Sequence, residues 1–140
     1  MDYRPTLRTQ TDLEDAWRHL VSPLGFSSPS LWFVLITADD QLFPHVTRFD
    51  EAATPPSPDE VAGLADLMAE LRDELAPGGR VAFLRSRPGR PGITAEDRAW
   101  ARALYDVGRH AGIPIEVVHR ACDDDLVPIP MDDALPDSAA

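Results

Sequence analysis

Two arginines near the middle of the chain have the residue type and spacing of an anion site. Arg85 and Arg87 stand two residues apart at the end of an apolar run, and a Pro-Gly pair at 88–89 turns the chain directly after them. Alternate residues of a strand point to the same side, so both guanidinium groups should face one way. Paired N–H donors of this kind hold phosphate or carboxylate. The pattern therefore indicates either a pocket for an anionic ligand or ion pairs with nearby carboxylates such as Glu96 and Asp97.

Thr94 and Asp97 follow the arginines, three residues apart, where the next helical pattern begins. A hydroxyl at the N-cap and a carboxylate in the first turn are typical of a helix N-terminus. The same N-terminus also favours a bound anion. We expect Thr94 to cap this helix, and a contact of Thr94 or Asp97 with the ligand is the alternative.

His119 ends a later apolar run and is the candidate acid or base beside such an anion site. The alternative for an isolated histidine is a place in the core or at its rim. His19, His45 and His110 stand at no interval that metal ligands use, and the one cysteine, Cys122, excludes an internal disulfide and a cysteine zinc cluster. We expect no metal and no cofactor.

The first half of the chain reads as a helix, a hairpin and a second helix. Thr11 or Asp12 is the expected N-cap of the first helix, which stops before Pro23. Apolar runs at 31–36 and 42–49 flank an Asp-Asp turn, which predicts a hairpin whose first strand is central because both of its faces are apolar.

Ser57, Pro58 and Glu60 form a capping pattern at the start of the second helix, 58–75. We expect this helix to bury one continuous apolar face. That face comprises Val61, Leu64, Leu67, Met68, Leu71 and Leu75.

The second half continues with a buried strand at 80–86, a loop, a helix from Thr94 to a Gly112 C-cap, and a strand at 113–121. A last edge strand is expected around 127–130, and residues 131–140 read as a flexible acidic tail. This order predicts a three-layer α/β fold with a mixed central sheet. The chain is a single domain, residues 1–140, with its core between about 11 and 130.

Composition narrows the classes of function. The 140 residues carry a formal net charge of -11, and all thirteen cations are Arg. Nucleic acid is therefore not an expected partner, because phosphate binding needs a basic face.

No apolar run is long enough for a bilayer and the N-terminus lacks the pattern of a signal peptide, so we expect no membrane contact and a cytoplasmic location. Absence of Lys and Asn beside fourteen Pro is typical of a GC-rich bacterial genome.

The motif at residues 85–97 resembles the metal-binding motif of a known family. Arg85-Ser86-Arg87-Pro88 followed by Thr94-Ala95-Glu96-Asp97 is similar to the His-x-His-Pro and Ser-x-x-Asp frame of the RadC-like branch of the JAB/JAMM metalloprotease superfamily. The similarity runs from about Leu31 to Ile129 through "ADDQL", "SPDEVAGLADLM" and "ALYDVGRHAGIPIEVVH". His119 resembles the histidine that ends the corresponding strand of that family.

The resemblance implies a JAB/cytidine-deaminase-like sheet and a lost metal site. Enzymes of this family hold zinc with the two histidines and the aspartate, and a glutamate from elsewhere is the base. A guanidinium offers donors but no lone pair, so Arg85 and Arg87 cannot take the place of the histidines. The resemblance therefore favours a non-catalytic domain that works as a protein-interaction or ligand-sensing module.

Two other interpretations stay open. In one, the chain is an anion-binding protein or an enzyme that holds a phosphate or carboxylate ligand with Arg85 and Arg87 and uses His119 as acid or base. In the other, metalloprotease chemistry survives with ligands that the motif does not reveal. The expected partner is accordingly an unidentified protein or a small anionic ligand. A homodimer through the strand 43–49 or a helix face is a further expectation, because an open sheet edge tends to pair.

Overall fold

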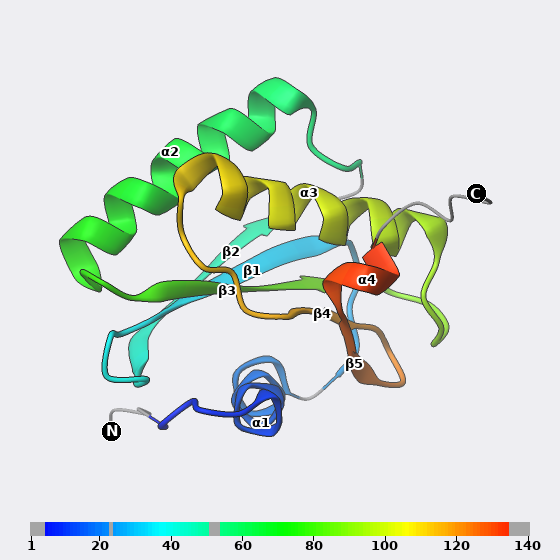
Figure 1. Ribbon diagram of the computed structural model, residues 1–140. Helices are drawn as coiled ribbons and strands as arrows, with labels where there is room; N and C mark the ends of the chain where they lie inside the picture. Colours follow the sequence, from blue (N-terminus) through cyan, green and yellow to red (C-terminus); the bar gives the residue numbers. More distant parts are fainter. Residues whose placement is uncertain (1–4, 23, 51–53, 135–140) are drawn as a thin grey trace.

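A computed structural model describes residues 5–22, 24–50 and 54–134, and these form a three-layer α/β fold. A five-stranded sheet lies in the middle, with α1 on one face and α2 and α3 on the other (Figure 1). The predicted fold class is confirmed. The elements in chain order are α1 (Gln10–Val21), β1 (Ser30–Ile36), β2 (Leu42–Asp50), α2 (Pro58–Leu75), β3 (Arg80–Ser86), α3 (Ala95–Ala111), β4 (Val118–Ala121), β5 (Leu126–Ile129) and α4 (Met131–Ala134).

The strand order is β2-β1-β3-β4-β5, and the sheet is mixed as predicted. β3 and β4 are parallel, with α3 as the crossover between them, while the other three neighbouring pairs are antiparallel. β1 pairs on both sides, so the expected central position of the first hairpin strand is confirmed. β2 and β5 are the two edges of the sheet.

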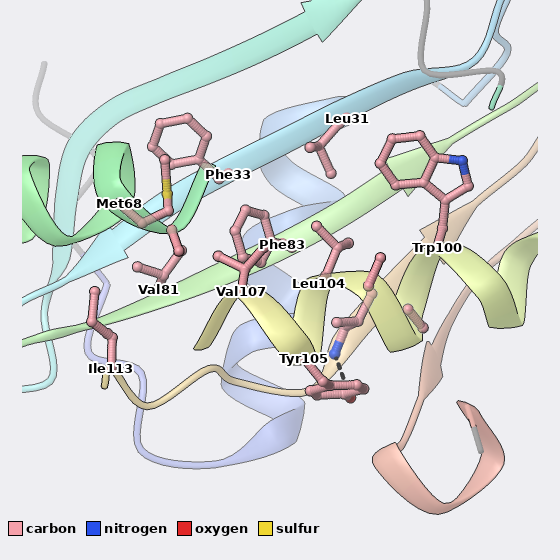
Figure 2. Packing of buried hydrophobic residues seen from close by; sticks show 14 of the residues in the cluster. Leu31, Phe33, Met68, Val81, Phe83, Trp100, Leu104, Tyr105, Val107 and Ile113 are labelled. Atoms are coloured by element: carbon pink, nitrogen blue, oxygen red, sulfur yellow. Dashed lines mark hydrogen bonds between the residues drawn. The ribbon is translucent and has the colours of Figure 1, made fainter. Parts of the chain in front are cut away.

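The larger core fills the space between the sheet and the layer of α2 and α3. Phe33 and Phe83 rise from β1 and β3 beneath Met68 of α2 and Leu104 of α3, and all four are buried (Figure 2). Gly108 lets α3 approach the chain that leads into β4, because a Cβ at this position would collide with Ile115.

A smaller core lies on the opposite face of the sheet, under α1. Trp17 and Leu13 of α1 are buried against Val34, Leu84 and Leu126 of the sheet. α1 is thus held to the sheet by its apolar side, and the predicted first helix is confirmed. In the described part of the chain, no helix is long and apolar enough to cross a bilayer.

Capping boxes begin all three long helices. Ser57 and Glu60 cap α2, and Thr94 and Asp97 cap α3, as the spacing predicts. The expected cap of α1 at Thr11 or Asp12 is wrong by a few residues. Thr9 is the cap, and Asp12 is the partner that receives the backbone N–H of Thr9.

The apolar face expected for α2 is only partly buried. Val61, Ala65 and Met68 face the core, whereas Leu67 and Leu75 are exposed. α2 packs against α3, and Val61 of α2 and Ala103 of α3 both line a hollow between the two helices. Leu64 and Leu71 are half-buried against the core, so two of the four leucines of α2 contribute to it only in part and the other two are exposed.

Two boundaries near the C-terminus differ from the expectation. The strand predicted at 113–121 is regular only from Val118, and Ile115 makes a single bridge to Val81. Residues 131–134 are not part of a flexible tail but form α4, whose Ala134 is buried. Ala134 accepts a hydrogen bond from Arg102 of α3, which holds α4 against that helix. Residues 135–140 of the expected tail lie outside the described residues.

Candidate functional site

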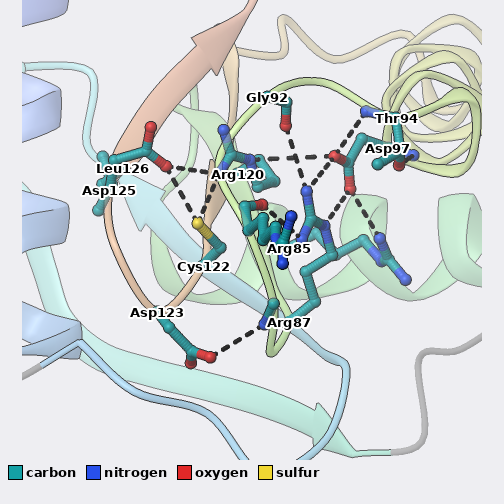
Figure 3. A network of polar contacts seen from close by, with 12 residues as sticks. Arg85, Arg87, Gly92, Thr94, Asp97, Arg120, Cys122, Asp123, Asp125 and Leu126 are labelled. Atoms are coloured by element: carbon teal, nitrogen blue, oxygen red, sulfur yellow. Dashed lines mark hydrogen bonds and ion pairs between the residues drawn. The ribbon is translucent and has the colours of Figure 1, made fainter.

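Three arginines meet at the carboxyl ends of β3 and β4, beneath the N-terminus of α3 (Figure 3). Arg85 and Arg120 are register partners on the two parallel strands, and Arg87 follows Arg85 by two residues. Strand alternation therefore turns all three side chains toward the α3 face. The capping box of Thr94 brings the carboxylate of Asp97 down onto them. We call Arg85, Arg87, Asp97 and Arg120 the Arg–Asp centre.

Asp97 is the acceptor at the middle of the Arg–Asp centre, and its side chain has no exposed surface. Oδ1 accepts from Arg85 Nη1 and Arg87 Nε, each at 2.9 Å. Oδ2 accepts from Arg87 Nη2 at 2.9 Å and from the Thr94 backbone N–H at 3.0 Å. A carboxylate has about four lone-pair sites. Those of Asp97 are fully used by N–H donors.

Arg87 uses all five of its donors within the chain. Nε and Nη2 form a bidentate pair with Asp97. The remaining N–H groups donate to the backbone carbonyls of Pro88, Arg90 and Gly92. Arg87 therefore fastens the loop at 88–92 to the start of α3, and an anion could reach this guanidinium only by displacing one of these acceptors.

Arg85 lies deeper, with 2% of its surface exposed. Nη1 donates to Asp97 and Nη2 to Glu96 at 2.5 Å, while the guanidinium carbon lies 5.7 Å from the ring centroid of Trp100. The buried guanidinium of Arg85 thus forms ion pairs and a cation–π contact at the same time. The ion pairs of the arginines with Asp97 and Glu96, one of the two arrangements that the sequence left open, are confirmed.

Arg120 extends the Arg–Asp centre toward β5. Its Nη1 donates to Asp125 at 2.5 Å and contacts Cys122 Sγ at 2.9 Å, and its Nε lies 3.9 Å from Asp97. Sequence reasoning overlooked Arg120. An arginine inside the apolar run "VVHRAC" was the available signal, but only the pairing of β3 with β4 shows that it stands beside Arg85.

Asp123 also holds the loop at 88–92, through hydrogen bonds to backbone N–H groups. Its carboxylate accepts from the backbone N–H groups of Gly89 at 3.0 Å and Phe26 at 3.0 Å. These two hydrogen bonds hold the pKa of Asp123 below its ordinary value. The Pro-Gly loop is consequently anchored at both ends, by Asp123 and by Arg87.

His119 is not part of the Arg–Asp centre. It is the register partner of Leu84 and faces the α1 side of the sheet, opposite Arg120. The ring is fully buried, its Nδ1 lies 3.1 Å from the carbonyl oxygen of Val117, and its Nε2 has no hydrogen-bond partner among the described residues. Burial lowers the pKa of His119, so the ring is neutral. The structure thus unites four of the five predicted site residues and separates the fifth.

The charge state of Asp97 follows from opposing effects. Burial disfavours its charged form, but the Arg87 hydrogen bonds, the Thr94 backbone N–H and the charges of Arg87 and Arg85 outweigh that cost and hold the pKa of Asp97 below its ordinary value. The same pairing raises the pKa of Arg87. The pair is therefore fully ionised at neutral pH.

The donor set of the Arg–Asp centre does not fit a zinc ion. Zinc needs lone pairs from three or four ligands. Here Asp97 has none to spare, and its neighbours are cations. No group of three or more His, Cys, Asp or Glu in the described ranges is placed to hold a metal. A hollow of about 310 Å³ between the start of α2 and α3 contains none of the predicted site residues.

The chain thus forms a three-layer α/β domain with a buried cluster of ion pairs at the carboxyl ends of β3 and β4. No protein-family model matches the chain, and no curated protein matches it in sequence.

Proposed function

We propose that this chain is a non-catalytic JAB/RadC-like domain that works as a protein-interaction or ligand-sensing module. The observation that carries this proposal is the saturation of Asp97, which stands where the resemblance places a zinc ligand. Four N–H donors occupy its carboxylate oxygens. The position implied for a metal instead holds ion pairs that join β3, β4 and α3.

The Arg–Asp centre contributes to the fold rather than to a reaction. Each member has its charge balanced inside the protein, and Asp97 and Arg85 are almost completely buried. A reacting group must reach its substrate within about 3 Å. Asp97 is closed off by the three arginines and Thr94, so it has no free oxygen to offer as a base.

The competing function is an anion site built on Arg85 and Arg87. The hydrogen bonds favour the non-catalytic proposal, because every N–H of Arg87 already has an acceptor within the chain. A phosphate would have to exchange places with Asp97, and a like charge beside Asp97 would be repelled.

Elemental analysis and thermal melting test the proposal together. After exhaustive dialysis, we expect far less than one zinc per chain, and neither added zinc nor phosphate, sulfate or a small carboxylate should raise the melting temperature beyond a chloride control of equal ionic strength. A ligand that binds only the native state must raise it. About one tightly held zinc per chain would overturn the proposal. An anion-dependent shift lost in Arg87→Ala would support the competing anion site instead.

A further inference from the structure

The leucines of α2 that are exposed or only half-buried recur along one side of the helix. We call Leu64, Leu67, Leu71 and Leu75 the leucine flank. They recur three or four residues apart and therefore lie along one side of the helix. Leu67 is 37% and Leu75 39% exposed, while Leu64 and Leu71 are half-buried.

The edge strand β2 adds apolar side chains that contact the same core as α2. Phe49 is 37% exposed and stacks on Phe33 with 5.8 Å between ring centroids, and Phe43 is half-buried against the same core. Among the described residues, three of the four exposed large hydrophobic side chains are Phe49, Leu67 and Leu75. Concentration of exposed apolar groups in one region marks an interaction surface.

Carboxylates border the leucine flank on its solvent side. Glu70 and Glu74 follow Leu67 and Leu71 by three residues each, so they are their neighbours on the helix surface, and both are exposed. α2 as a whole carries six acidic residues and a single cation, Arg72. An apolar stripe edged by negative charge fits a partner whose apolar stripe is edged by positive charge.

The same charges disfavour a second copy of this chain. A twofold dimer presses one surface patch against its own copy. Glu70 and Glu74 of one subunit would then approach those of the other across the leucines, and the chain already carries a net charge of -11. Addition of a strand to β2 is also disfavoured, because Pro44 interrupts the row of N–H donors on that edge strand.

We propose that the leucine flank, with Phe49, binds an amphipathic helix of a partner protein whose apolar face is bordered by Lys or Arg. This inference rests on the proposed interaction function and specifies its surface and partner. A helix lying along α2 would cover Leu67 and Leu75 with its own apolar side chains, as helices pack ridge into groove. Its basic border would pair with Glu70 and Glu74.

Fluorescence anisotropy with a synthetic peptide tests this proposal. The probe is a labelled helix of roughly five turns with leucines three or four residues apart and lysines elsewhere. A second peptide of the same composition has its leucines scrambled around the helix, so it keeps the charge and loses the apolar face. We expect the wild-type protein to bind the amphipathic peptide at least about tenfold more tightly than the scrambled one.

Two double variants separate the apolar from the charged contribution. Leu67→Gln with Leu75→Gln should remove the preference for the amphipathic peptide. Glu70→Gln with Glu74→Gln should weaken both peptides and flatten their salt dependence. Met131→Gln is the matched control, because Met131 is 49% exposed but lies on α4. Circular dichroism should show unchanged folding for each variant, since all of these side chains are exposed.

An equal preference in wild type and the leucine variant would overturn the inference, as would equal binding of both peptides by wild type. Sedimentation that shows a wild-type dimer, and a monomer for the leucine variant, would assign the surface to a second copy and would also overturn it. None of these substitutions touches the Arg–Asp centre. Zinc or an anion bound at that centre would therefore overturn the proposed function by a separate measurement.

Discussion

Replacement of Arg87 by alanine is the most direct test of the Arg–Asp centre. The substitution removes the bidentate pair with Asp97 and the three hydrogen bonds to the loop carbonyls. Asp97 would stay buried, with Arg85 at 2.9 Å and the Thr94 N–H at 3.0 Å as its remaining close donors. The buried carboxylate would thus lose half of its hydrogen bonds and one of its two close countercharges.

The number of hydrogen bonds that Asp97 loses sets the expected decrease in the free energy of unfolding. Removing one partner of a buried ion pair typically costs about 3–5 kcal/mol. Arg85 continues to compensate Asp97, so we expect the lower end, about 3 kcal/mol. In a domain of this size such a loss lowers the melting temperature by about 10 °C. Arg90→Ala is the control, because it removes the same charge from the same loop while the Arg90 side chain is exposed.

Urea denaturation at neutral pH measures the free energy of unfolding of wild type and both variants. Repeating Arg87→Ala in an Asp97→Asn background completes a double-mutant cycle, and the cost of losing Arg87 should fall there by at least about 1 kcal/mol. If Arg87→Ala costs no more than Arg90→Ala, within about 0.5 kcal/mol, then the pair with Asp97 does not stabilise the fold and the structural reading of the centre is wrong.

Three further results are expected. Thr94→Ala should lower the free energy of unfolding by on the order of 1 kcal/mol through loss of the α3 cap, and an unchanged urea midpoint would show that Thr94 does not cap. Because burial lowers the pKa of His119 in the folded state, its stabilising effect is complete above its ordinary pKa of 6.5 and declines as the pH falls below that value. This pH-dependent loss, at most about 1.4 kcal/mol per pH unit, should disappear in His119→Gln, and identical pH profiles would contradict it. The lowered pKa of Asp97 gives stability that is present above 3.8 and lost as the pH falls through its lower folded-state value. Acid unfolding followed by circular dichroism should therefore show a shallower acid limb for Asp97→Asn than for wild type.

Local chemistry made much of the fold predictable. Ser57 with Glu60 and Thr94 with Asp97 satisfy backbone donors within one turn, so their caps could be located without any knowledge of tertiary contacts. Thr9 was missed because two later residues, Thr11 and Asp12, also have capping side chains. Helical spacing identified the leucines of α2, but it could not show which of them the neighbouring α3 would leave exposed, since that depends on the rotation of the helix.

The full set of residues in the candidate site could not be predicted from any single segment, because it depends on how the strands pair. Arg85, Arg87 and Asp97 are close in sequence, and pairing of the arginines with Asp97 was one of the two arrangements that the sequence left open. Arg120 lies beside these residues only because β3 pairs in parallel with β4. His119 precedes Arg120 on β4 and therefore faces the opposite side of the sheet, away from the Arg–Asp centre. A shift of one residue in that register would exchange the two.

The saturation of Asp97 also bears on how this sequence can change over generations. Replacing any one member of the Arg–Asp centre takes hydrogen bonds or countercharge from the buried charges that remain, so each single step is costly even where a concerted replacement would be neutral. The centre should therefore behave as an epistatic unit in which Arg85, Arg87 and Asp97 are either kept together or lost together.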